Sequence, residues 1–550
     1  MDQSQPLSCK SLGVLIAVVA VIWFALLGYR DLVDPDEGRY AEIPREMVAS
    51  GDWITPRLNG FKYFEKPVLH YWVTAISLSL FGDTNGAARL GVVLLAFLGA
   101  LWILYLGRRL FGPDAGMYAF LVLCSSLMYV LLGHLNILDL DVSVYLSLGI
   151  GALLLAQTQR DRPPTVRNWM LVGWAALALA TLSKGLIGLV LPGVALVLYT
   201  LWQRDWALWK HLHLGKGLVL FLSITVPWFV LVSRANPEFA QFFFIHEHLE
   251  RYTTTTHERV EPWWFFVPLL FIGAMPWLWN SVSALVRPGF APAATDQGGF
   301  DPVRFLWVYV VGILLFFSVG QSKLPPYILP VYPALALLIG RQLASRPALP
   351  GVFGGYVLTL LAVGYGAFAV TGFHDYESPT ALLAYRTWIL VAMGVLVAGL
   401  GLGVVYRLRP RRAIIALAVS GLLALQLLGW GFQTQSRHRS SHELAEVIKS
   451  QVGDDVPVYN VDTFYHSLPF YLGRDVILVG FKGELAMGIE QEPRNWVSNW
   501  PEFARRWQEA EQAVAVFDMK IYPDVYQARM AQLPMRVIYQ DPLKIAVVRQ

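Results

Sequence analysis

The sequence predicts an α-helical polytopic membrane protein with a small α/β domain at the end of the chain. Its 550 residues are 55% hydrophobic and 15% charged, whereas soluble globular proteins carry about 25% charged residues. Thirteen apolar segments are long enough to cross the hydrocarbon core, which takes about 20 residues of helix. The residues after 433 are polar and alternate short β-rich runs with helical stretches, which is typical of a soluble α/β domain.

The first apolar segment follows Lys10 and is longer than a signal-peptide core of about 7–15 residues, so we expect a retained anchor. The two cysteines, Cys9 and Cys124, are too few for a disulfide framework. The predicted spans are 11–29, 88–107, 114–133, 139–157, 168–183, 185–202, 215–233, 263–285, 303–320, 326–343, 350–372, 381–405 and 412–432.

A further apolar stretch, 67–82, is short and contains His70, and we expect it to lie at the membrane interface. With thirteen spans and the N-terminus inside, the arginine-rich loops 160–167, 204–216 and 407–412 all fall on the cytoplasmic side, as the positive-inside rule requires. A fourteenth span would move them outside. The same parity places the remaining segments outside: 30–87, 134–138, 183–185, 234–262, 321–323 and the C-terminal tail.

We therefore predict two domains, a transmembrane domain over 1–433 and a soluble α/β domain over 434–550. The expected strands of the second domain are 456–461, 475–480, 513–517, 536–539 and 544–548, with helices over 441–451 and 501–511.

The charged side chains gather on the predicted outer side. The densest cluster starts at Asp34, and residues 36–50 form the pattern of a short amphipathic helix. Asp36 lies where the first span leaves the membrane, so its carboxylate can be partly desolvated and suited to acid–base or cation-binding work. The alternative is a solvated loop. Lys66, beside Glu65, is either half of a surface ion pair or a phosphate ligand at the headgroup level.

Three further segments bring charges to this side. Asp139 begins a span, where it either caps the helix dipole or faces an outer cleft. Lys184 lies in an outer turn, against the positive-inside tendency, and either snorkels or binds an anion together with Arg251.

The outer loop also contains His246-Glu247-His248. This spacing differs from that of the zinc peptidases, and an ordinary polar loop is one interpretation. In the other, His246 combines with the distant Glu65 to hold a divalent metal, either zinc or magnesium or manganese.

These residue types suit a reaction at a phosphate carried by a membrane lipid. Cations stabilise a departing phosphate, a carboxylate orients or deprotonates the acceptor, and a metal acts as a Lewis acid. Nucleotide donors are scarce outside the cytoplasm, so the activated donor would be lipid-linked. A transporter would need ionisable groups deep in its spans, and segments such as 88–105 and 185–200 are nearly free of them.

The motif that begins Asp34-Pro35-Asp36-Glu37, followed by Gly51-Asp52-Trp53 and Tyr63-Phe64-Glu65-Lys66-Pro67, resembles the GT-C glycosyltransferases. These multi-span enzymes use polyprenyl-phosphate sugars. The resemblance covers most of the chain and is closest to the bacterial branch that transfers 4-amino-4-deoxy-L-arabinose to lipid A, a relative of the protein O-mannosyltransferases.

The resemblance implies a bacterial inner-membrane enzyme with a periplasmic active site and a periplasmic C-terminal domain. It would move aminoarabinose from undecaprenyl phosphate to a phosphate of lipid A, with inversion, and so lower the affinity of cationic peptides such as polymyxin. No nucleic-acid partner is expected. By matching motifs, Asp36 is the leading catalytic carboxylate and Asp139 its partner. The remaining implied residues are Lys66, Lys184, Arg251 and Tyr327 around the polyprenyl phosphate, and Glu65 with His246 as metal ligands near the donor.

Two alternatives stay open at this stage. A protein hydroxyl could be the acceptor, as in mannosyl transfer, and Asp36 would then act as a general base. A lipid-linked sugar flippase is the other, and it requires ionisable groups within the spans.

Overall fold

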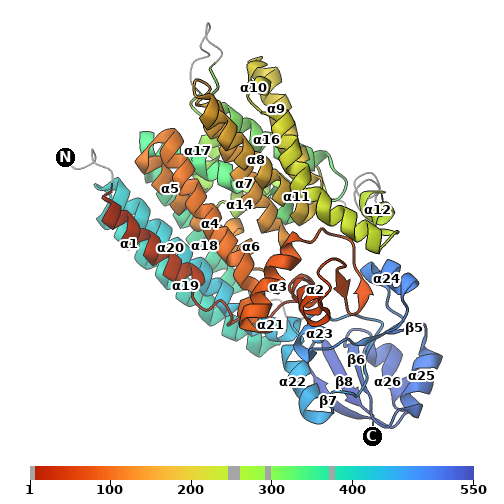
Figure 1. The fold of residues 1–550 in the computed structure, drawn as a ribbon. Coiled ribbons are helices and arrows are strands. Elements are labelled where there is room, and N and C mark those ends of the chain that lie inside the picture. Colours follow the sequence, from red (N-terminus) through yellow and green to blue (C-terminus); the bar gives the residue numbers. More distant parts are fainter. Residues whose placement is uncertain (1–6, 246–260, 291–298, 348, 371–377, 550) are drawn as a thin grey trace.

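The computed structural model describes residues 7–245, 261–290, 299–347, 349–370 and 378–549. A bundle of helices fills one end of the molecule and a mixed α/β domain the other (Figure 1). The bundle helices are α1 Cys9–Phe24, α4 Asn85–Phe111, α5 Pro113–Cys124, α6 Leu127–Leu132, α7 Leu138–Gln157, α8 Pro163–Lys184, α9 Ile187–Gln203, α11 Leu214–Ala235, α14 Phe266–Gly273, α15 Leu278–Val286, α16 Pro302–Val319, α17 Val331–Ser345, α18 Leu349–Ala369, α19 Pro379–Val405 and α20 Pro410–Gly431.

Each predicted span coincides with one of these helices or with a pair of them. Seven of the described helices are long and apolar enough to cross a membrane, and four shorter apolar helices accompany them. The chain is therefore a multi-pass membrane protein, and the count of thirteen spans stays a prediction. Short helices α10 Ala207–Lys210 and α12 Phe239–Gln241 cap the bundle, and the 3-10 turn η2 Pro325–Ile328 precedes α17.

Two spans predicted as continuous are each broken into two helices, and that prediction is wrong for 114–133 and 263–285. In the first, the hydroxyls of Ser125 and Ser126 donate to carbonyl groups one turn earlier, which competes with the helical pattern. In the second, Pro276 removes a backbone donor. The breaks meet, because the Leu127 N–H donates to the Met275 carbonyl at 3.1 Å. Each break thus satisfies backbone groups of the other, as an apolar surrounding demands.

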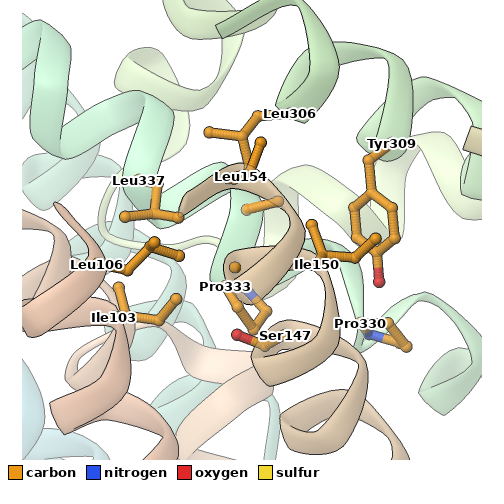
Figure 2. A pocket seen from close by; sticks show the side chains of 12 residues that line it. Ile103, Leu106, Ser147, Ile150, Leu154, Leu306, Tyr309, Pro330, Pro333 and Leu337 are labelled. Carbon is orange, nitrogen blue, oxygen red and sulfur yellow. The ribbon is translucent and has the colours of Figure 1, made fainter. Parts of the chain in front are cut away.

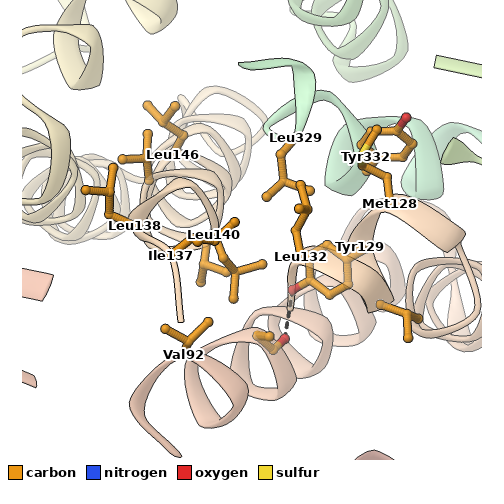
Figure 3. Close-up of a cluster of buried hydrophobic side chains, with 14 of the residues drawn as sticks. Val92, Met128, Tyr129, Leu132, Ile137, Leu138, Leu140, Leu146, Leu329 and Tyr332 are labelled. Atoms are coloured by element: carbon orange, nitrogen blue, oxygen red, sulfur yellow. Dashed lines mark hydrogen bonds between the residues drawn. The ribbon is translucent and has the colours of Figure 1, made fainter. Parts of the chain in front are cut away.

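The bundle core is packed with aliphatic and aromatic side chains where α4, α6, α7 and α17 meet (Figure 3). The two tyrosine hydroxyls labelled there are satisfied: that of Tyr129 donates to the Ala96 carbonyl at 2.7 Å, and that of Tyr332 donates to the Leu269 carbonyl at 3.1 Å. A small apolar crevice lies between α4, α7, α16 and α17 (Figure 2). Its lining includes no Asp, Glu, Lys, Arg or His side chain. This part of the bundle has no chain of ionisable groups such as a transport path needs.

The loop between α1 and α4 contains the expected helix, α2 Asp36–Ser50, and a second one, α3 Leu69–Phe81. Between them lies an unpredicted hairpin, β1 Arg57–Leu58 and β2 Phe61–Lys62. Its turn is Asn59-Gly60, with φ of 56° and 78°, the combination that favours a two-residue hairpin turn. The Asn59 amide donates to the Val476 carbonyl and accepts from the Val476 N–H, both at 2.8 Å. The hairpin tip is therefore fixed to the C-terminal domain.

The C-terminal domain is built on a six-stranded sheet in the order β5-β4-β3-β6-β8-β7. Four neighbouring strands are parallel and the last two are antiparallel. The five predicted β-runs form strands, and the sixth, β5, is too short to give a sequence signal. The elements are α21 Gln433–Arg439, α22 His442–Gln451, β3 Val458–Val461, α23 Ser467–Leu472, β4 Ile477–Val479, α24 Ala486–Gln491, β5 Trp496–Val497, α25 Trp500–Glu509, β6 Val514–Asp518, α26 Gln527–Met530, β7 Arg536–Gln540 and β8 Lys544–Val548.

Candidate active site

The start of α7 and the end of α8 bring three predicted residues into contact. Asp139 lies in the first turn of α7, and Lys184 is the last residue of α8. The Lys184 ammonium donates to the Asp139 carboxylate. It also lies 5.0 Å from the centroid of the Tyr327 ring, a cation–π distance. Both helix ends favour these charges through their dipoles, and the two side chains also neutralise each other.

Tyr40 on α2 is a buried tyrosine whose pKa responds to carboxylates from three segments. Burial raises the pKa of Tyr40 above its ordinary value, and Arg39 opposes that shift. The carboxylates that raise it further belong to Asp36, Asp139 and Glu65. These three acids come from separate segments: the start of α2, the start of α7 and the segment before α3. Tyr40 was not singled out from the sequence, although it lies one helical turn after Asp36 and so shares its face.

Asp36 itself is accessible, with 58% of its side chain exposed. Its carboxylate accepts a hydrogen bond from Arg39 at 3.3 Å. Arg39, which is mostly buried, also donates to Glu484 of the C-terminal domain at 2.9 Å. Burial alone would raise the pKa of Glu484, but the His466 imidazole and Arg39 hold it at about 2. The C-terminal domain thus supplies an ionised acid to the candidate site.

Glu37 organises the backbone around this site. Its buried carboxylate accepts six hydrogen bonds, four of them from Arg30 and Arg89 at 2.7–3.3 Å. The other two come from backbone N–H groups, of which that of Asn136 belongs to the segment that leads into α7. Because this segment continues to Asp139, Glu37 ties the start of α2 to the start of α7. Sequence reasoning noted Glu37 only as one of several acids.

Glu65 and Lys66 lie in the segment before α3, and both are mostly buried. The Lys66 ammonium donates to the Glu65 carbonyl at 2.9 Å and lies 3.7 Å from its carboxylate. His246 and Arg251 lie outside the described residues. The metal pair of Glu65 and His246, and the contribution of Arg251 to a phosphate pocket, therefore stay predictions.

Behind Tyr40 lies a buried acid–imidazole pair that was not predicted. The His70 Nδ1 is 2.9 Å from the Asp141 carboxylate, and both side chains are almost completely buried. The His70 ring meets the Tyr40 ring edge-on at 5.2 Å between centroids. Asp141 and His70 thus form a buried pair two residues beyond Asp139 on α7, and the pair helps to hold Tyr40 in place.

The site therefore combines an accessible carboxylate, a second carboxylate paired with a lysine, and a buried tyrosine at one end of an apolar bundle. The lysine is suited to an anionic group. The accessible acid is suited to positioning an incoming nucleophile. The arrangement can support group transfer from a phosphate at the lipid boundary.

Comparisons with known proteins agree with this chemistry. Two family models match: the aminoarabinose transferase C-terminal domain over 444–549, and the dolichyl-phosphate-mannose-protein mannosyltransferase family over 65–230. The undecaprenyl phosphate-alpha-4-amino-4-deoxy-L-arabinose arabinosyl transferase of Erwinia tasmaniensis is 32% identical over 400 residues, which cover 69% of this chain and 71% of that protein. The alignment with the protein of the same name from Edwardsiella ictaluri, at 34% identity, spans 59% of this chain and 58% of that relative.

A solved structure extends the match to nearly the whole chain. The crystal structure of ArnT from Cupriavidus metallidurans bound to undecaprenyl phosphate has 36% sequence identity and a TM-score of 0.90, and the alignment covers 98% of both chains. The same protein in the apo state gives a TM-score of 0.88. With this likeness in sequence and fold, the chain belongs to the undecaprenyl phosphate-alpha-4-amino-4-deoxy-L-arabinose arabinosyl transferase family.

Proposed function

We propose that the protein transfers 4-amino-4-deoxy-L-arabinose from undecaprenyl phosphate to a phosphate of lipid A. The observation that carries the proposal is the full-length likeness to a structure solved with undecaprenyl phosphate. The match of the tail to the aminoarabinose transferase C-terminal domain favours this branch over mannosyl transfer to a protein hydroxyl, although the mannosyltransferase family model matches 65–230.

The reaction is a direct displacement at the anomeric carbon. An oxygen of the acceptor phosphate forms the new bond to that carbon while the bond to the undecaprenyl phosphate oxygen breaks. The leaving group takes the electron pair, and the configuration inverts. The acceptor phosphate is already anionic near neutral pH, so Asp36 positions the acceptor or the sugar amine and need not remove a proton. Lys184, held by Asp139, stabilises the charge on the leaving phosphate together with Lys66 and Arg251.

A divalent metal held by Glu65 and His246 remains part of the proposal. Glu65 supplies a mostly buried carboxylate near Tyr40, which suits such a ligand. When bound, the ion would supply Lewis-acid stabilisation of the donor phosphate. The steps above use only side chains of the chain itself.

The proposed location is the bacterial inner membrane, with the active site and the C-terminal domain on the periplasmic side. The distribution of arginine-rich loops supports this orientation. Both substrates are membrane lipids, and the site lies at the end of the bundle beside the C-terminal domain (Figure 1).

Mass spectrometry of lipid A tests the function. Cells that express the gene should contain lipid A with the added mass of an aminopentose, and cells without it should not. The same cells should differ in polymyxin susceptibility, since the modification masks negative charge. Equal lipid A spectra from both strains, with the protein present in the membrane, would overturn the proposal.

Lys184→Met removes the ammonium group that neutralises Asp139 and faces Tyr327. We expect the KM for the lipid-linked donor to rise and turnover to fall, together costing about tenfold or more in kcat/KM, because a charge-assisted contact to a phosphate contributes about 1.5–3 kcal/mol. Radiolabelled donor and purified enzyme give both constants. Lys216→Met, an exposed lysine at the other end of the bundle, is the control. Unchanged kinetics in Lys184→Met would remove this residue from the donor site.

A further inference from the structure

Three carboxylates meet at the junction between α2 and the C-terminal domain, away from the residues of the proposed mechanism. Glu42 and Glu46 lie one turn apart on α2, and Asp475 lies two residues before β4. One oxygen of each carboxylate lies within 4.8 Å of the others. Figure 1 shows α2 beside this domain, with the β1–β2 hairpin at the same junction.

The charges at this junction are not balanced by the side chains around it. Arg45 donates to both oxygens of Glu42 at 2.6 Å and so neutralises one carboxylate. Arg57, the other cation that acts on the cluster, is engaged by a different acid at 2.7 Å. The charges of Glu46 and Asp475 are therefore left without a cation of their own in the described part of the chain. A buried charge requires a partner, and a metal ion is one of the partners that proteins use.

Glu46 has an oxygen that meets no donor. Only 9% of this residue is exposed, and its Oε2 accepts a hydrogen bond from the Gly60 N–H at 3.0 Å. Its Oε1 is buried, with no hydrogen-bond partner among the described residues. Burial raises the pKa of Glu46, and the carboxylates of Glu42 and Asp475 raise it further. The three neighbouring carboxyl groups thus share too little positive charge to compensate all of them.

We propose that this junction binds a Ca²⁺ ion between α2 and the C-terminal domain. The ligands are all carboxylate oxygens, the donors that hard cations prefer. Ca²⁺–oxygen distances of about 2.3–2.6 Å allow two ligands to lie up to about 5 Å apart, whereas Mg²⁺ demands tighter octahedral geometry at about 2.0–2.1 Å. Asp475 is exposed and leaves the ion a route from solvent, and water molecules would complete its coordination.

The ion would connect α2 to the C-terminal domain, and both of these parts contribute residues to the candidate active site. Helix α2 contains Asp36 and Tyr40, and Asp475 leads into β4 of the sheet. The junction is already joined by the contacts of Asn59 with Val476, so the ion would tighten an existing interface. The site uses neither Glu65 nor His246, and it does not depend on the proposed transferase function.

Equilibrium dialysis of the purified full chain against radioactive Ca²⁺, after EGTA treatment, tests the proposal. Wild type should bind one Ca²⁺ per chain, and Ca²⁺ should raise its thermal transition temperature. Asp475→Asn should lose both responses, and because Asp475 is exposed this variant should still fold. Glu46→Gln should lose them as well. Asp455→Asn, an exposed acid of the same domain, should behave as wild type, and so should Glu65→Gln.

Absence of bound Ca²⁺ in wild type at millimolar concentration would overturn the proposal, and a proton would then be the compensating partner of the acids. Equal Ca²⁺ binding by wild type and Asp475→Asn would place the ion elsewhere and would overturn it equally. Loss of binding in Glu65→Gln together with retention in Asp475→Asn would assign the ion to the other pair of residues.

Discussion

Asp36→Asn should abolish most of the transfer activity and leave the fold intact. The side chain is 58% exposed, and the pair it forms with Arg39 at 3.3 Å is long, so its charge adds little to stability. We expect turnover to fall by about 10²-fold or more, because misplacement of a reacting group by about 1 Å costs that much. The KM for the lipid-linked donor should change little, because the lysine of the donor site, Lys184, is paired with Asp139 and not with Asp36.

The measurement is transfer from radiolabelled donor to lipid A by purified enzyme, with Asp83→Asn as the matched control. Asp83 is an exposed acid in the short connection between α3 and α4, and it lies in the same loop between α1 and α4 as Asp36. Near-wild-type turnover in Asp36→Asn would exclude this carboxylate from the reaction.

The pH profile of the same variant separates the two acceptors. A protein hydroxyl must lose a proton, so wild type would then show an acidic limb in kcat that disappears in Asp36→Asn. A phosphate acceptor is already ionised, and the variant should then lose activity by the same factor at every pH near neutrality. If the acidic limb of the kcat–pH profile is present in wild type and absent in Asp36→Asn, the result would favour the mannosyl-type reaction.

The elements that could be predicted from the sequence are those set by local composition. Apolar runs identified the bundle helices, and the helical repeat of apolar residues over 36–50 identified α2. Both signals depend only on how each helix divides its own side chains between apolar and aqueous surroundings. The breaks at Ser125 and Pro276 were missed because each is stabilised by the other, through the contact of Leu127 with Met275. Breaks of this kind depend on tertiary pairing.

In the candidate site, too, some features could be predicted from local sequence and others depend on tertiary contacts. Sidedness was enough to expect Asp139 and Lys184 on one face, and the structure brings them into contact. The link from Arg39 to Glu484 joins residues 445 positions apart, and no local pattern marks it. Glu37 was indistinguishable from its acidic neighbours, because its importance comes from two arginines and two backbone groups in other segments.

Glu37→Gln should be the most destabilising of these substitutions. It preserves the shape of the side chain but removes the charge that Arg30 and Arg89 share, and those guanidinium groups are largely buried. Breaking a buried ion pair by neutralising one partner costs about 3–5 kcal/mol, since the other charge is left without compensation. Activity should fall as well, because the Asn136 N–H would lose its anionic acceptor and the start of α7, with Asp139, would be held less firmly.

Denaturant unfolding of the purified protein in detergent, followed by tryptophan fluorescence, measures the loss. Glu502→Gln is the control, because its ion pair with Arg506 on α25 is partly exposed and such pairs contribute at most about 1 kcal/mol. Equal stability of the two variants would mean that the arginines find other partners, and Glu37 would then not organise the site.

Acid titration gives the charge contribution of Glu37 separately from its packing. Burial alone would raise the pKa of Glu37, but Arg30 and Arg89 outweigh it and lower the pKa from 4.5 to about 2. A carboxyl whose pKa is lower in the folded than in the unfolded chain stabilises the fold fully above its unfolded pKa, and loses that contribution as the pH falls through its folded value. The stability difference between wild type and Glu37→Gln should therefore be largest above about pH 4.5 and shrink toward pH 2. A glutamine has no proton to gain, so other acids that titrate in this range cancel in the comparison. A difference that stayed constant across this range would show that the ionisation of Glu37 does not contribute to stability, and that the glutamine amide destabilises the fold in another way.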